Sequence, residues 1–262
     1  MENVLEKIIR EKKEDIKIIK KKNSLNAIEN KIKSTEGFLD FKKTIIDNEK
    51  QNKVSLIAEV KKASPSAGII IKDFDPVEIA NTYFENNATC LSILTEEKFF
   101  LGNLNYITNI KKKLKLPILA KDFFIDPYQV SYSKSFGCDC ILIILAALSE
   151  KQADEIYDEC LKQKLSVIVE VHNEKEAEMA LKYSKAIIGI NNRDLKTLNV
   201  SLDNSTRIKK KLVSHVGPLI SESGIKTKNE LLDLSNKTSI KTFLIGESLL
   251  KNLEKNSIFS VL

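Results

Sequence analysis

Val167-Ile168-Val169-Glu170-Val171 is an apolar run of the length of one β-strand, with a single acidic residue near its end. Seven similar runs recur at intervals of roughly 20 to 35 residues, which is room for one strand, one helix and two short loops. They cover residues 54–60, 89–94, 117–121, 139–145, 186–191, 217–221 and 242–246. Runs so uniformly apolar are typical of parallel strands that are buried on both faces. Eight of them, alternating with helical stretches, predict an α/β fold, a (βα)8 or TIM barrel.

The competing architecture is an open, doubly wound sheet. That fold favours a Gly-x-Gly-x-x-Gly loop after the first strand, and residues 63–68, Ala-Ser-Pro-Ser-Ala-Gly, do not match it. The length of 262 residues suits a single barrel of about 250 residues. We therefore expect one domain overall. Residues 1–50 form an N-terminal helical extension, one or two helices broken at Gly37, and residues 51–262 form the barrel.

The net charge of +6 and the lysines near the N-terminus could suit an anionic macromolecule such as DNA. However, Ile8, Ile9, Ile16 and Ile19 recur at helical spacing, and acidic residues intersperse the lysines, including Lys12. This pattern favours a solvated amphipathic helix over a nucleic-acid-binding arm. No apolar run approaches the about 20 residues that span a bilayer, and residues 1–22 lack the apolar core of a signal peptide. We expect a cytoplasmic protein that binds neither nucleic acid nor membrane. The sequence is compatible with a monomer and does not determine the oligomeric state.

The cysteines do not have the spacing of a metal site or of a disulfide framework. They are Cys90, Cys138, Cys140 and Cys160, and neither His172 nor His215 lies near them in sequence. We expect them to be small buried hydrophobes and expect no metal.

Polar side chains interrupt several of the apolar runs at their ends. In a barrel of this kind, catalytic groups lie at the C-terminal ends of the strands. Glu59 and Lys61 lie on the same side of the first strand, where a salt bridge that stabilises the barrel mouth would explain this pair alone. Three further strands end in Lys121, in Glu170, and in Asn191 and Arg193. So many ionisable groups on one rim exceed what packing needs and favour an active site.

Two glycine turns follow the last two strands, at residues 221–224, Ser-Glu-Ser-Gly, and 246–248, Gly-Glu-Ser. Glycine lets backbone N–H groups turn toward an anion. A single Ser-Gly turn is commonplace. Two of them, after the strands that commonly form the phosphate site of a barrel, predict that the ligand carries a phosphate.

The same segments resemble the indole-3-glycerol phosphate synthase family. The first strand and its loop, residues 57–66, Ile-Ala-Glu-Val-Lys-Lys-Ala-Ser-Pro-Ser, are similar to its strand 1 signature. Further similar blocks occur in order along the chain, at residues 91–100, 121–129, 169–172, 189–195, 221–225 and 244–249. The resemblance spans residues 50 to 250 and is more specific than any one motif.

The resemblance implies a substrate, 1-(2-carboxyphenylamino)-1-deoxyribulose 5-phosphate, which is converted to indole-3-glycerol phosphate, CO2 and water in tryptophan biosynthesis. It implies no cofactor, because the reaction needs neither a redox centre nor a metal. By carry-over from the family, Lys121 is the general acid of ring closure and Glu170 the general base of dehydration. Glu59 and Lys61 assist them, and which lysine serves which step stays open.

The family likewise implies which residues bind the substrate. Asn191 and Arg193 position its hydroxyl and charged groups. The phosphate is assigned to Ser64, Ser223, Gly224, Gly246 and Glu247, the last through its backbone N–H only, since a carboxylate repels a phosphate dianion. Phe99 and Phe123 are expected to line the pocket for the aromatic ring, with core packing as the alternative.

Two rival functions fit parts of this pattern. Phosphoribosylanthranilate isomerase is a related barrel, but that family presents a cysteine near the end of its first strand, where this chain has Glu59-Val60-Lys61. A non-catalytic phosphate-binding scaffold would keep the glycine turns and lose the acid and base, whereas Lys121 and Glu170 are both present.

Overall fold

Eight parallel strands close into a barrel in the computed structural model, which describes residues 3–195, 197–253 and 256–262. In chain order they are β1 (Ser55–Val60), β4 (Cys90–Leu94), β5 (Ile118–Lys121), β6 (Cys140–Ile144), β7 (Ser166–Val171), β8 (Ile187–Asn191), β9 (Leu219–Glu222) and β10 (Thr242–Ile245). β1 pairs with both β4 and β10, which closes the sheet. Each boundary lies within two residues of its predicted apolar run, so the predicted barrel is confirmed.

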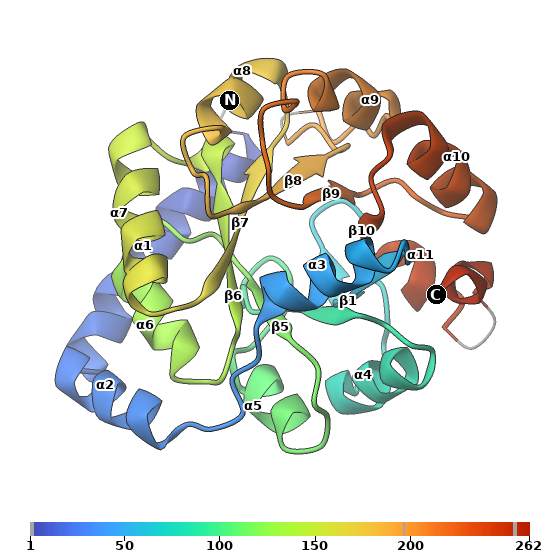
Figure 1. Cartoon of the computed structure of the whole chain (residues 1–262). Helices are drawn as coiled ribbons and strands as arrows, with labels where there is room; N and C mark the ends of the chain where they lie inside the picture. The colour runs from blue at the N-terminus through green and yellow to red at the C-terminus, as the bar shows by residue number, and fades with distance from the viewer. Residues whose placement is uncertain (1–2, 196, 254–255) are drawn as a thin grey trace.

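Helices surround the barrel on the outside (Figure 1). They are α4 (Pro76–Glu85), α5 (Asn105–Lys111), α6 (Tyr128–Lys134), α7 (Glu150–Lys162), α8 (Glu174–Ala180), α9 (Asp203–Lys209), α10 (Lys228–Thr238) and the short α11 (Glu247–Leu250). Short 3-10 turns follow at η1 (Leu145–Ala147) and η2 (Ser257–Val261), and a small ribbon, β2 (Ala63–Ser64) with β3 (Gly68–Ile69), lies in the loop after β1. Within the described part of the chain, no helix has the length and apolarity to cross a membrane.

The barrel interior is a packed layer of apolar side chains. Ile57, Leu119, Leu142 and Ile168 belong to it, and so do side chains of the other strands. The end of the interior at the N-termini of the strands is closed by Phe41 and Ile45. Both belong to α3 (Phe41–Lys50), which lies across this end of the barrel (Figure 1). A second, larger apolar layer fills the space between the strands and the outer helices.

Asp139 ties the segment before α3 to the bottom of the barrel. Its carboxylate accepts hydrogen bonds from the backbone N–H of Leu39 at 2.7 Å and of Ile118 at 2.8 Å, and pairs with Lys111 at 2.5 Å. The side chain is fully buried, so these partners compensate for its lost hydration.

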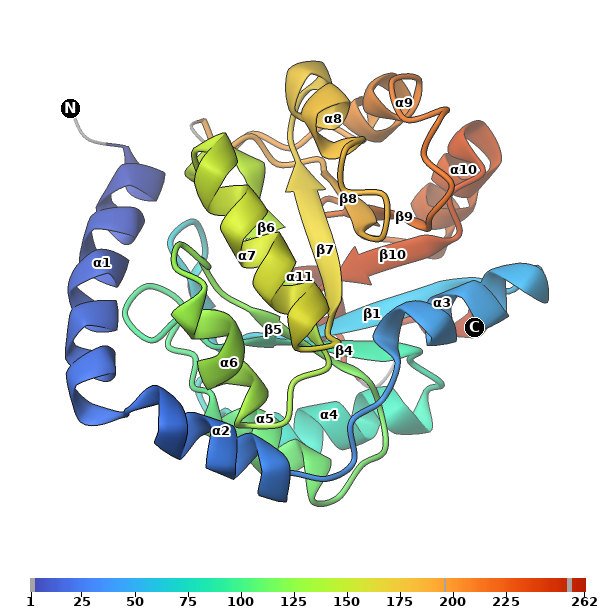
Figure 2. The same cartoon turned by 60° about the vertical axis from the view of Figure 1, so that its left-hand side comes forward.

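Three helices precede the barrel, where the sequence predicted one or two. Gly37, with a φ of +79°, separates α2 (Leu25–Ser34) from α3 as expected. A further break separates α1 (Val4–Lys22) from α2, because the Ser24 side chain accepts the backbone N–H of Ala27 and caps a new helix. α2 packs against α6, and α1 runs from there to η1, toward the end of the barrel where the strands terminate (Figure 2).

Lys12 on α1 was predicted to be solvated and is instead buried. It lies between the buried Ile8 and Ile16, and its ammonium pairs with Asp122 at 2.7 Å. Lys20 on the same helix pairs with Asp126 at 2.6 Å. The basic helix is thus bound to the loop after β5 by ion pairs.

Candidate active site

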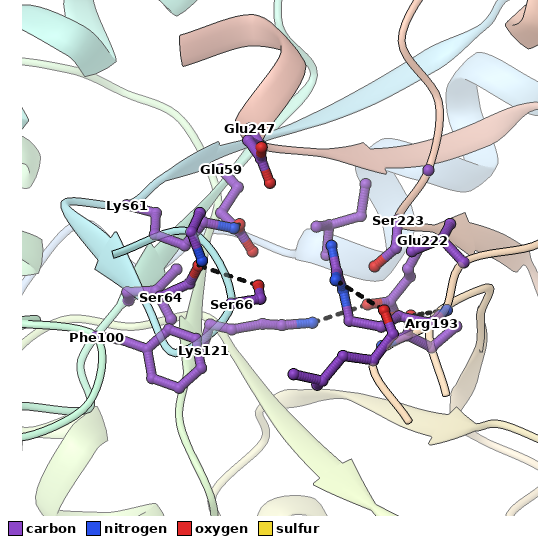
Figure 3. A pocket seen from close by; sticks show the side chains of 18 of the residues that line it. Glu59, Lys61, Ser64, Ser66, Phe100, Lys121, Arg193, Glu222, Ser223 and Glu247 are labelled. Atoms are coloured by element: carbon purple, nitrogen blue, oxygen red, sulfur yellow. Dashed lines mark hydrogen bonds and ion pairs between the residues drawn. The ribbon is translucent and has the colours of Figure 1, made fainter. Parts of the chain in front are cut away.

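A cavity of about 1070 Å³ opens at the C-terminal ends of the barrel strands. Its walls come from the loops after β1, β5, β8, β9 and β10, and Val4, Leu5 and Ile8 of α1 line one side of it. Figure 3 shows Lys121 extended across this cavity toward Glu222, with Glu59 and Lys61 close to each other. The N-terminal helix therefore forms part of the wall, in addition to packing against the barrel.

Lys121 lies between two buried glutamates. Its Nζ is 2.8 Å from Oε2 of Glu222 on β9 and 3.1 Å from Oε2 of Glu170 on β7. Although burial alone would lower it, the carboxylates of Glu170, Glu222 and Glu59 raise the pKa of Lys121 well above its usual value. The lysine is therefore held as a cation by its carboxylate neighbours.

The two glutamates differ in their surroundings. Oε1 of Glu170 accepts the amide of Asn191 at 3.0 Å, and although burial alone would raise it, Lys121 and His172 hold the pKa of Glu170 well below its usual range. For Glu222, burial and the like charge of Glu170 raise the pKa to about 7 despite Lys121. Lys121 thus lies between one ionised carboxylate and one whose pKa is close to neutrality.

Glu59 and Lys61 form an ion pair at 2.5 Å, as the period of the strand predicts. Gly246, after β10, lies directly against this glutamate: a Cβ at position 246 would be 2.3 Å from Oε1 of Glu59. The missing side chain at this position therefore provides space for Glu59 as well as a turn.

Asn191 and Arg193 both line the cavity. The Asn191 amide is engaged by Glu170, and its Oδ1 accepts the backbone N–H of Arg193 at 2.9 Å. The guanidinium of Arg193 donates to the carbonyl of Leu198 at 3.2 Å. Asn191 thus orients the glutamate, and Arg193 presents a cation at the wall.

The residues predicted to bind phosphate also line the cavity. Ser223 and Gly224 have consecutive left-handed φ angles of 67° and 90°, which turn the backbone after β9 toward the opening. The hydroxyl of Ser64 accepts the backbone N–H of Ala67 at 3.1 Å. The carboxylate of Glu247 pairs with Lys251 at 2.5 Å, which neutralises its charge beside the turn.

The structure places Phe99, which was expected to line the pocket, outside the cavity, and Phe100 within its lining. Phe99 instead faces Lys7 of α1, whose ammonium is 5.7 Å from the ring centre. The reason is Glu96, whose buried carboxylate accepts the backbone N–H groups of Lys98, Phe99 and Phe100 and curls the loop. Phe123 lines the cavity as expected, 6.2 Å from Phe100 between ring centres.

Comparison with known proteins identifies the family. The family model described as "Indole-3-glycerol phosphate synthase" matches residues 5–261. The chain belongs to the indole-3-glycerol phosphate synthase family. An indole-3-glycerol phosphate synthase from Alkaliphilus metalliredigens is 43% identical over 253 residues, covering 95% of this chain and 93% of the relative. One from Azospirillum brasilense is 40% identical over 259 residues, covering 96% and 95%.

Solved structures outside the indole-3-glycerol phosphate synthase family have the same architecture. A tryptophan synthase alpha chain from Legionella pneumophila superposes with a TM-score of 0.61 at 13% identity, covering 84% of this chain and 93% of that one. Monomers of phosphoribosylanthranilate isomerase from Thermotoga maritima give a TM-score of 0.53 at 10% identity, covering 79% and 94%. At these identities the likeness concerns the fold alone.

Glu222, like Phe100, lines the cavity of this indole-3-glycerol phosphate synthase family member and was not predicted as a site residue. It ends β9 and was treated as part of a phosphate-binding turn. The available signal was the alternation of the strand, because Ile220 belongs to the barrel interior and Glu222, two residues later, faces the same way.

Proposed function

We propose that this chain converts 1-(2-carboxyphenylamino)-1-deoxyribulose 5-phosphate to indole-3-glycerol phosphate, CO2 and water in tryptophan biosynthesis. One observation carries the proposal: Lys121 is held between two buried glutamates in a cavity that also has two glycine turns for an anion. Membership of the family supplies the substrate and the reaction type, that of a carbon-carbon lyase.

Lys121 acts first, as the general acid of ring closure. The ring carbon that bears the carboxylate attacks the ribulose carbonyl, and the negative charge that develops on the carbonyl oxygen receives a proton. Loss of CO2 from the same ring carbon then restores the aromatic ring. The place of the Lys121 ammonium in the cavity, between Glu170 and Glu222, supports this role.

Glu170 acts in the dehydration as the general base. The new hydroxyl group leaves as water, and a proton is removed from the adjacent carbon to form the indole double bond. Glu59 and Lys61 assist, with Lys61 binding the anionic substrate and sharing in proton transfer. Asn191 fixes Glu170, and Arg193 positions the charged and hydroxyl groups of the ligand.

The phosphate binds at the turns after β9 and β10, together with Ser64. Backbone N–H groups at Ser223, Gly224, Gly246 and Glu247 are its donors in this proposal. Phe100 and Phe123 receive the aromatic ring, and the apolar side chains of α1 cover it.

The remaining features of the proposal concern the protein as a whole. The N-terminal extension and the barrel form one domain, because Phe41 and Ile45 complete the interior layer of the barrel. The enzyme is a cytoplasmic monomer that binds a small phosphorylated molecule and no nucleic acid. The pairing of Lys12 and Lys20 with acidic residues of the barrel supports this last point.

A steady-state assay tests the proposal. The purified protein is given the carboxyphenylamino substrate, and indole fluorescence and CO2 release are followed with and without a chelator. We expect equal turnover in both conditions. Absence of turnover by folded protein would contradict the assigned reaction.

A further inference from the structure

His172 connects the site to the outside of the barrel. It directly follows β7, and its side chain, 7% exposed, points the same way as that of Glu170 two residues earlier. Its Nε2 lies 3.0 Å from Oε1 of Glu170, and its Nδ1 lies 3.2 Å from Oε2 of Glu176 on α8. The same Glu176 oxygen accepts the backbone N–H of His172 at 2.7 Å, so the ring is held between two carboxylates.

This geometry requires a charged ring. A neutral imidazole has one N–H and presents a lone pair at its other nitrogen. Both nitrogens lie close to carboxylate oxygens, so a neutral ring would set a lone pair against one of them. The imidazolium hydrogen-bonds to Glu176 through Nδ1 and meets Glu170 as an ion pair at 3.0 Å, since Nε2 makes no aligned hydrogen bond within the described residues. Although burial alone would lower it, Glu170 and Glu176 raise the pKa of His172 to about 9.

The charged ring makes the two glutamates beside Lys121 unequal. Oε1 of Glu170 has the Asn191 amide and His172, and Oε2 has Lys121. Within the described residues, Glu222 has one cationic partner, Lys121, and its Oε1 has no hydrogen-bond partner. Without His172, Glu170 and Glu222 would share Lys121 as the cation that stabilises their charge.

Other charged groups around this cluster are few. Lys121 on β5, Glu222 on β9 and Glu59 on β1 are the ones that face Glu170 and its lysine. β6 and β8 carry no ionisable side chain toward it apart from buried cysteine. On α8, Glu174 and Glu178 pair with Arg207 and Lys211 on the outer surface.

We propose that His172 is a positioning residue: held as an imidazolium by Glu176, it keeps Glu170 ionised as the base and leaves Glu222 as the glutamate that exchanges a proton. The inference rests on the proposed function, because it assigns a base to the dehydration step. It adds a residue that touches neither substrate nor reacting atoms and acts through Glu170.

The pH dependence of turnover tests this role. His172→Gln keeps a hydrogen-bond donor and cannot carry the charge. Loss of one adjacent charge commonly shifts a carboxyl pKa by about 1–3 units, so the acidic limb of the kcat profile should move upward by at least about one pH unit. KM should stay within about threefold of the wild-type value, because the interactions that bind the substrate and the transition state equally are not affected.

A titration of the histidine ring tests the charge state without turnover. The chain has only 2 histidines, so their NMR resonances can be assigned by replacing His215. We expect His172 to titrate near pH 9 in the wild type. Glu176→Gln keeps a side-chain acceptor for the backbone N–H of His172 but should lower the titration midpoint of the His172 ring by about one unit or more. The matched control Glu178→Gln, on the same helix, should leave that midpoint unchanged.

These outcomes separate the inference from the function on which it rests. A His172 midpoint below pH 7 in the wild type, or an active His172→Gln enzyme with the wild-type acidic limb, would overturn the role of His172. If His172→Gln does not fold, the titrations of the wild type and Glu176→Gln still decide the charge state. Absence of wild-type turnover would instead contradict the proposed reaction.

Discussion

The ammonium of Lys12 lies 2.7 Å from Oδ1 of Asp122, the residue that follows Lys121 at the end of β5. The carboxylate of Asp122 also accepts the hydroxyl of Thr95 and its neighbour's backbone N–H, so it is fixed from three sides. This contact makes the N-terminal helix part of the frame that holds the strand carrying Lys121.

Lys12→Met should weaken both stability and substrate binding. The change leaves a mostly buried carboxylate without its cation, which costs on the order of 1–3 kcal/mol of unfolding free energy. It also loosens the helix that lines the cavity, so KM should rise more than kcat falls. Urea unfolding and steady-state kinetics measure both effects. The exposed Lys13, changed to Met, serves as control; equal behaviour of the two variants would refute the structural role of Lys12.

Gly189→Ala should lower turnover by displacing Glu222. A Cβ at position 189 would lie 2.1 Å from Oε1 of Glu222 and 3.1 Å from Cγ2 of Ile168. The carboxylate must therefore move away from its place beside Lys121, and we expect kcat to fall by about 10-fold or more, since misplaced groups cost rate steeply. In a Glu222→Ala background the same change should add little, because the clash is gone. Additive losses in the double variant would argue against this explanation.

Glu222→Gln should change how stability depends on pH. The pKa of Glu222 is raised to about 7 in the folded protein, chiefly by burial, above its value in the unfolded chain. The carboxyl group therefore contributes stability fully below pH 4.5 or so, and that contribution is lost as the pH rises through about 7. Glutamine resembles the protonated form. The unfolding free energy of the variant relative to wild type should thus increase from pH 5 to pH 8.

Chemical denaturation at several pH values measures that difference. We expect a gain of about 2–3 kcal/mol for the variant across this window, since the pKa of Glu222 is raised from 4.5 to about 7 and one pKa unit corresponds to about 1.4 kcal/mol. A difference that is flat with pH would mean that Glu222 titrates normally in the folded protein.

Gly224→Ala should weaken phosphate binding. The residue has a φ of +90°, and a Cβ there would lie 2.5 Å from Cγ1 of Val200, so the turn must shift. We expect the KM of the substrate and the inhibition constant of inorganic phosphate to rise together, by about 10-fold for one lost charge-assisted hydrogen bond. Gly37→Ala is the matched control, because its φ is +79° and nothing lies within 4 Å of the added carbon. Unchanged phosphate inhibition in a folded Gly224→Ala enzyme would contradict the placement.

The barrel could be predicted closely because its signal is repeated. Strands buried on both faces must be apolar along their whole length, and eight such runs leave few alternatives for the fold. The same alternation placed Glu59 with Lys61 and brought Lys121 and Glu170 to one rim. These are consequences of local sequence within a regular architecture.

The features that were missed depend on contacts between distant segments. The burial of Lys12 requires Asp122, which lies far along the chain, and no helical pattern reveals that partner. Phe100 lines the cavity in place of Phe99 because the Glu96 carboxylate curls the loop. It accepts the backbone N–H groups of three successive residues, 98 to 100. Short loop geometry of this kind is set by hydrogen bonds, and periodicity does not encode it.

The most direct test of the central claim is the turnover of Lys121→Met, measured as indole formation from the carboxyphenylamino substrate at saturating concentration. The exposed Lys113→Met serves as control for the loss of a lysine, and circular dichroism confirms the fold of both. Removal of a general acid commonly costs about 10²–10⁴-fold, so kcat of Lys121→Met should fall by at least about 10²-fold while Lys113→Met stays near wild type. A folded Lys121→Met enzyme with near-normal kcat would contradict the account.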